Sequence, residues 1–235
     1  MRVSINEIQT IILKACIAVG LPVGISQDAS QAAEHVFPLY RDSMEPFSDA
    51  ISAVDRKFAN EFNISQAAKG IFKSSVIEKK LSALYTAPTV CDQILVHNKN
   101  NQGHLLITLI NLDVPAIIIF EILSISRFLN SDIGITWTID QGDTMQGVCE
   151  GGEIKFDRGN YQELFLIRNS TLVLSTTNCV SALDHTYIDK LDVSNNLNID
   201  TSTWKILCKY AERLLVPSND TSRMTGAGAG TIDTD

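Results

Sequence analysis

The sequence lacks the short motifs that identify most catalytic and metal-binding proteins. It contains no HExxH pair, no GxSxG segment and no CxxC pair, which argues against a zinc site and a serine hydrolase. Its five cysteines are an odd number and stand far apart. This usage argues against a disulfide framework and indicates reduced thiols, so a buried, inert Cys179 is favoured over a nucleophilic one. No metal site is predicted, and no cofactor is identified.

Basic residues are also too few for several classes of partner. The chain has 19 lysines and arginines against 27 aspartates and glutamates, which gives a net charge of −8. A surface of this sign repels phosphate backbones and anionic lipid head groups, so we expect neither a nucleic acid nor a membrane as partner. A local arginine or lysine can still hold a small anion against this overall charge.

Long hydrophobic runs are missing as well. The longest apolar run covers residues 114–129, contains Glu121 and Arg127, and is shorter than a comfortable membrane span. We therefore predict a buried helix over residues 115–129. No basic segment leads into an apolar run near Met1, so we expect no signal peptide and a cytoplasmic location.

The apolar residues that are present suffice for one compact domain. Hydrophobic residues make up 45% of the 235 residues and charged residues 20%, which is ordinary for a globular protein. Residues 1–86 are predicted to be helical. A capping box begins the first helix at Ser4, and Gly20 ends it in a left-handed conformation. A second helix is expected from about Ser26 to Pro38, and apolar stripes over 51–62 and 71–84 extend the helical pattern.

From about residue 87 the pattern changes to short apolar runs separated by polar turns. We predict a mainly antiparallel β region over 87–216, interrupted by the buried helix and followed by a helix over 202–215. His97 and His104 are expected to flank a hairpin turn. The predicted strands cover 94–96, 105–110, 133–139, the surroundings of Val148, 154–156, 164–167 and 172–174. Segregated helices and strands indicate an α+β fold, with a Gly-Ala tail over 217–235.

The two ends of the chain together resemble a bacterial family of uncharacterised function. Its members commonly open with Ser-x-Asn-Glu and close with Ser-Arg-x-x-Gly-Ala-Gly-Ala-Gly followed by acids. The matching residues here are Ser4-Ile-Asn-Glu7, Lys14-Ala15, Gly20, Gly24, Val216-Pro-Ser, Ser222-Arg223 and Gly226-Ala-Gly-Ala-Gly230-Thr-Ile-Asp233-Thr-Asp235. The chain departs from the family at Cys16-Ile-Ala-Val and over a longer segment 43–80. The resemblance implies no reaction, but it implies that the two termini form one unit.

The Gly-Ala tail is the first candidate site. Successive backbone N–H groups can form an anion-binding concavity, and a nearby arginine can supply a forked donor for a carboxylate or phosphate. Two terminal aspartates can bind a cation or an amine. The predicted ligand-binding residues are Arg223, Gly226, Gly228, Gly230, Asp233 and Asp235, together with Asn6. The alternative interpretation is a flexible terminus.

Glu7, Lys14 and His185 are the predicted catalytic residues. Glu7 and Lys14 are two helical turns apart and share a face, so both can reach one pocket. The alternative is a helix cap beside a solvated lysine, and the two interpretations of Glu7 compete. His185 follows Asp184, a carboxylate that can raise the histidine pKa. The alternative for His185 is a surface loop.

These candidate sites support three alternative hypotheses for the function of the protein. The leading hypothesis is an enzyme acting on a small anionic metabolite, with the tail and the first helix forming the site. The second is a non-catalytic homo-oligomer in which the tail packs into a neighbouring subunit. The third is a module that binds a small ligand without turnover.

Overall fold

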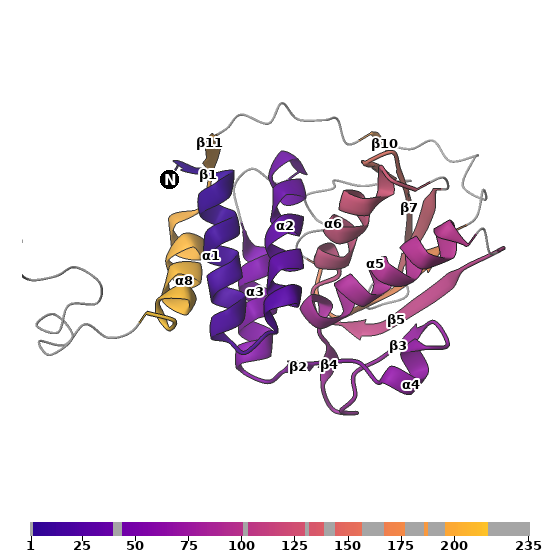
Figure 1. The fold of residues 1–235 in the computed structure, drawn as a ribbon, viewed down its shortest axis with the longest axis horizontal. Coiled ribbons are helices and arrows are strands. Elements are labelled where there is room, and N and C mark those ends of the chain that lie inside the picture. The colour runs from indigo at the N-terminus through magenta and orange to yellow at the C-terminus, as the bar shows by residue number, and fades with distance from the viewer. Residues whose placement is uncertain are drawn as a thin grey trace, which may run out of the picture.

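The chain folds into a group of helices beside a mixed, mainly antiparallel sheet, which confirms the predicted α+β class (Figure 1). The computed structural model describes residues 2–39, 44–100, 103–129, 132–138, 144–156, 167–176, 186–187 and 196–215. Every helix among these residues is too short or too polar to span a lipid bilayer.

Nine of the described strands form the main sheet, in the order β10-β8-β7-β6-β9-β5-β4-β2, with β3 also paired to β5. From β10 to β5 in this order, each strand pairs antiparallel with the next, whereas β2, β3 and β4 run parallel to their neighbours. The strands are β2 (Ala59–Asn60), β3 (Ile71–Phe72), β4 (Lys80–Leu81), β5 (Leu106–Leu112), β6 (Ile133–Thr138), β7 (Thr144–Glu150), β8 (Glu153–Phe156), β9 (Ser170–Ser175) and β10 (Thr186–Tyr187).

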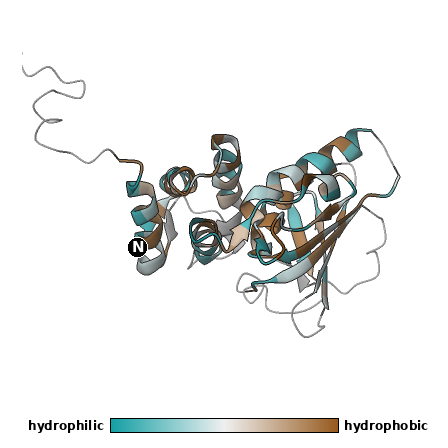
Figure 2. Cartoon of the chain, turned by 90° about the horizontal axis from the view of Figure 1, so that it is seen from below, coloured by the Kyte–Doolittle hydropathy of each residue, from teal (hydrophilic) through white to brown (hydrophobic). Residues whose placement is uncertain are grey.

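The helix α6 (Pro115–Ser126) lies between the sheet and the other helices. Ten of its twelve residues are buried, because α2 (Val23–Leu39), α3 (Glu45–Asp55) and α5 (Ala83–Lys99) pack on it together with β7 and β8. A helix that is apolar all round belongs in such a position. This confirms the predicted buried helix, although it ends at Ser126. In the view from below, brown apolar stretches run along the strands beneath their helix cover (Figure 2).

The helices α1 (Ile5–Ala18) and α8 (Thr201–Glu212) pack with α2 and α3 beside α6, whereas α4 (Ile64–Ala67) packs on β3 (Figure 1). The capping box at Ser4 is confirmed, since Ser4 and Glu7 exchange backbone and side-chain hydrogen bonds, and Gly20 has the predicted positive φ of 93°. A small second sheet joins β1 to β11, and α1 packs on α2 and α8. The elements are β1 (Arg2–Ser4), α1 (Ile5–Ala18), α2 (Val23–Leu39), α3 (Glu45–Asp55), α4 (Ile64–Ala67), α5 (Ala83–Lys99), β11 (Asn196–Asn198) and α8 (Thr201–Glu212).

The predicted strand over 94–96 is wrong, because these residues belong to α5. Val90, Cys91 and Ile94 are buried at helical spacing against the core. Pro88 lies inside the helix and not at its boundary. Packing of this buried face outweighs both the missing proline donor and the β-branched composition of the segment.

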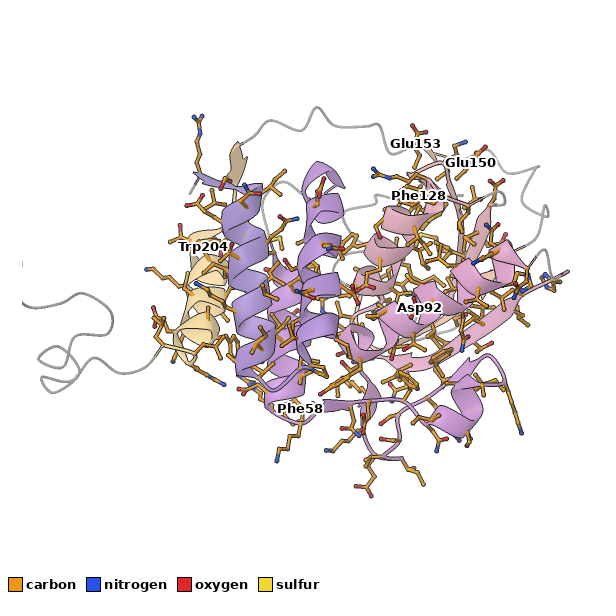
Figure 3. The ribbon with its side chains drawn as sticks, viewed as in Figure 1. Phe58, Asp92, Phe128, Glu150, Glu153 and Trp204 are labelled. Atoms are coloured by element: carbon orange, nitrogen blue, oxygen red, sulfur yellow. The ribbon has the colours of Figure 1, made fainter. Side chains whose placement is uncertain are left out.

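The predicted helical stripes over 51–62 and 71–84 are also corrected. The helix α3 ends at Asp55, after which Lys57 takes a positive φ of 60° and Phe58 is 60% exposed (Figure 3). The apolar residues that follow enter strands: Phe72 lies in β3 and Leu81 in β4, both buried. The described part of the region 1–86 is therefore helical with four short strands, β1 to β4. Of the other predicted strands, residues 164–166 lie outside the described ranges, as does the tail 217–235.

The carboxyl group of Asp113 joins three elements at the end of β5. Its Oδ1 accepts hydrogen bonds from the backbone amides of Ala83, the first residue of α5, and Val114, which precedes α6, at 2.8 and 2.7 Å. The backbone N–H of Asp113 donates to the carbonyl of Leu81 in β4. Asp113 is only 3% exposed, and its Oδ2 has no hydrogen-bond partner. Burial therefore raises the pKa of Asp113 to about 7, against the opposing effect of the two amides.

Asp113→Asn should change the pH dependence of stability. The pKa of an unfolded aspartate is about 3.9. Because the folded value is higher, the native state binds the proton more tightly, and this stabilisation is greatest below about pH 4 and disappears as pH rises through about 7. The variant should lose this slope, which amounts to an order of 3–4 kcal/mol in the free energy of unfolding between these limits. Urea titrations from pH 4 to 8 measure it.

Asp55→Asn is a control, because it should change the pH dependence of stability in the opposite direction. The hydrogen bond from Arg213 lowers the pKa of Asp55, so the wild-type contribution is present at neutral pH and is lost as pH falls. Equal slopes for wild type and Asp113→Asn would contradict the role given to the buried carboxyl group.

Candidate functional site

An open pocket of about 610 Å³ lies between α5, the turn from α4 to β3, and the start of β5. Its volume is within the range of small-molecule sites. The polar lining comes from all three segments and combines both signs of charge with neutral donors and acceptors. The lining residues are Ala68, Lys69 and Gly70 from the turn, Thr89, Asp92, Gln93, Val96 and His97 from α5, and His104, Leu105 and Leu106.

One face of α5 forms the longest wall of the pocket. Thr89, Asp92, Gln93, Val96 and His97 recur at intervals of three and four residues, so they lie on a single side of the helix. The opposite side is anchored in the core. The helix is therefore amphipathic, and its rigid attachment fixes where the polar side chains stand. Asp92 lies near the middle of α5 (Figure 3).

The turn after α4 forms the second wall and depends on Gly70. Asn63 caps α4, and the Gln93 side chain donates to the carbonyl of Ala67 at 3.1 Å, which ties this turn to α5. Gly70 has a φ of 73°, and a Cβ there would lie 2.6 Å from the carbonyl oxygen of Leu106. Only glycine satisfies both the left-handed backbone and this close approach to β5.

His97 closes the end of the pocket near β5. Its Nε2 lies 3.0 Å from the carbonyl oxygen of Gly103, which can only accept, so Nε2 carries a proton and donates. The hydroxyl of Thr176, the residue after β9, lies 3.4 Å from the same nitrogen and accepts from the amide of Leu105. His104 stands exposed beside them. The pocket therefore contains two imidazole rings.

Carboxylates gather behind Asp92, where α2, α5 and α6 pack together. Glu121 of α6 is 5% exposed, and its Oε1 has no hydrogen-bond partner. Burial, followed by the charges of Asp28 and Asp92, raises the pKa of Glu121 well above its ordinary value. Burial and Asp92 likewise raise the pKa of Asp28. Of these three carboxyl groups, only Asp92 lines the pocket.

The cysteines do not supply a nucleophile in the described part of the chain. Cys16, Cys91, Cys149 and Cys208 are free thiols, as predicted. Burial raises the pKa of Cys16 to about 12 and that of Cys91 well above its ordinary value. These thiols stay protonated at neutral pH and are core residues. Cys179 lies outside the described residues.

The sequence-predicted site residues are only partly covered by the structure. Glu7 is exposed and makes the cap bonds to Ser4, at 2.7 Å to the backbone amide, and these bonds lower the pKa of Glu7. Asn6 and Lys14 are exposed on the same helix, and none of the three lines the pocket. Their functional roles stay predictions. The others lie outside the described residues, namely His185, Arg223, Gly226, Gly228, Gly230, Asp233 and Asp235.

The pocket histidines were interpreted wrongly from the sequence. His97 and His104 do not flank a hairpin, because the first ends a helix and the second precedes a parallel-paired strand. The polar residues over 89–97 recur at helical spacing, and this spacing is the sequence signal for the pocket face of α5.

No cluster of three or more potential metal ligands exists among the residues that the structure describes. Comparison with protein-family models, with curated proteins and with solved structures yields no match to the chain. The pocket must therefore be interpreted from its own chemistry.

Gly70→Ala should destabilise the fold and distort the pocket. A left-handed alanine costs roughly 1–2 kcal/mol, and the clash with Leu106 adds to this cost. Gly24→Ala is the matched control, because Gly24 in α2 has open space around its Cβ position and an ordinary φ. We expect the control to keep or raise the melting temperature. A Gly70→Ala protein as stable as the control would contradict the close approach of the turn to β5.

Proposed function

We propose that the protein binds a small polar metabolite in the pocket along α5. The observation that carries the proposal is the composition of one concave site. Lys69, Asp92, His97 and His104 converge there from segments far apart in the sequence. A site of this size with a few placed polar groups is typical of small-molecule recognition.

The apolar residues of the pocket support the same proposal. Val96 is 58% exposed and Leu106 54% exposed, although both belong to well-packed elements. They border the polar groups and would shield a bound molecule from water, which strengthens its polar contacts. A ligand with a short hydrocarbon part and charged ends fits this lining.

Binding is proposed as the primary function, and turnover is a further possibility within the same site. His97 and His104 both line the pocket, and histidine is the side chain most often used in general acid–base catalysis. Mass spectrometry of metabolite mixtures incubated with the protein distinguishes the two cases. Depletion of the bound compound with appearance of a product indicates an enzyme, and unchanged composition indicates a binding module.

Val96→Trp tests the proposal by filling the pocket. We expect metabolites that raise the melting temperature of the wild type to lose at least about tenfold in affinity, because the indole occupies their volume. Ile206→Trp is the matched control. Ile206 is a 45% exposed apolar residue on α8, which is not part of the pocket. Thermal-shift screening followed by calorimetry measures both variants.

Ligands that bind both variants with wild-type affinity would place the binding site elsewhere and would contradict the proposal. A change of oligomer mass in Val96→Trp alone, seen by light scattering, would instead indicate that this face is an interface between subunits, distinct from the tail-mediated homo-oligomer expected from the sequence.

A further inference from the structure

We propose that the ligand of this pocket is a small zwitterion, with its ammonium group at Asp92 and its carboxylate toward Lys69, His97 and His104. The inference rests on the proposed function and names the class of molecule that the pocket would take. It follows from the arrangement of charge along α5.

The pocket has an acidic part and a basic part. Asp92 and His97 are five residues apart on one helix, which separates them by about 7.5 Å along the axis. Lys69 and His104 come from the other walls. Among the described residues, neither Lys69 nor Asp92 belongs to a salt bridge. Each charge is therefore available to a ligand.

The acidic part extends behind Asp92 into the protein. The charge of Asp92 acts on both Asp28 and Glu121, and the Oε1 of Glu121 is buried without a hydrogen-bond partner. Two effects shift the pKa values of Asp28 and Glu121, namely burial and the charges of other carboxylates. Each effect raises the pKa. A cation at Asp92 would offset this repulsion. An ammonium group suits the position because it is compact and donates up to three hydrogen bonds.

The basic part is suited to a carboxylate. The Lys69 ammonium is exposed on a flexible stem, while the imidazole of His97 is held by the carbonyl of Gly103. The whole chain carries a net charge of −8, so this local group of basic side chains is needed to hold an anion.

Simpler ligands match only half of the pocket. A plain carboxylate would place its hydrocarbon chain against Asp92, and a plain amine would leave Lys69 and the histidines facing an apolar group. A desolvated charge without a partner weakens binding. A zwitterion pairs both parts, and the axial spacing favours an amino acid whose charged groups are several carbons apart over glycine.

The test uses the full chain and a series of defined probes. Calorimetry measures the affinities of glycine, γ-aminobutyrate and ε-aminocaproate, with butyrate, hexanoate, butylamine and hexylamine as controls of matched length. We expect at least one longer zwitterion to bind about tenfold or more tightly than its matched carboxylate and its matched amine. Glycine should bind more weakly than the longer zwitterions.

Asp92→Asn identifies the group that recognises the ammonium. The variant should lose the preference for the zwitterion while keeping or improving the affinity for the matched carboxylate. Glu212→Gln makes the same change of charge on α8, outside the pocket, and should keep the wild-type preference. Asp92 is exposed, so circular dichroism should show both variants folded as the wild type is.

Two failures are distinguishable. If the zwitterions do not bind, or bind no better than the carboxylates, or keep their advantage in Asp92→Asn, the zwitterion inference is overturned. The proposed function survives that result if other metabolites bind the wild type and are lost in Val96→Trp. If every ligand found binds Val96→Trp as it binds the wild type, the proposed function fails as well.

Discussion

One buried carboxyl group determines how the helices leave the sheet. Asp113 accepts from the first amide of α5 and from the amide that precedes α6, so the positive ends of two helix dipoles converge on one Oδ1. Its backbone also bonds to Leu81 and, through its carbonyl, to the amide of Asn169. The starts of both helices, the end of β4 and the approach to β9 are therefore fixed at one point. Burial limits the ionisation of the group, and the two amides limit how far it can move.

This junction positions the pocket from a distance. The β5–β9 register shifts between Leu109 and Leu112, and Asn111 takes a positive φ of 55° there. Beyond this irregularity, Leu112 pairs with Leu81, so that Asp113, the next residue, lies at the start of α5. The helix then runs back along the strand, with one side in the core and the other side facing the turn at Gly70. A local bend in one strand thus sets the wall of a site at the far end of that strand.

Much of the fold followed from local patterns, whereas the candidate site did not. The capping box, the left-handed Gly20, the buried helix and the alternation over 133–138 depend on near neighbours, and each could be predicted. The helix around Pro88 depends on packing against α6 and on Asp113, which lies thirty residues after Ala83, the first residue of that helix. The helix and strand propensities of neighbouring residues do not reveal such a long-range contact. The pocket combines the segments 68–70, 89–97 and 104–106, so it could be recognised only after that helix was known.

The pairing of β1 with β11 has a consequence for how the chain acquires its structure. Arg2 pairs with Asn198, and α1 lies against α8, so partners from opposite ends of the described residues complete the helical group. The helix α1 is synthesised before α8, so the surface of α1 that α8 contacts stays uncovered until residues 201–212 have been made. Bringing α1 and α8 together closes a large loop of chain, and this closure costs conformational entropy. The helical group is therefore complete only when the two ends of the described residues meet.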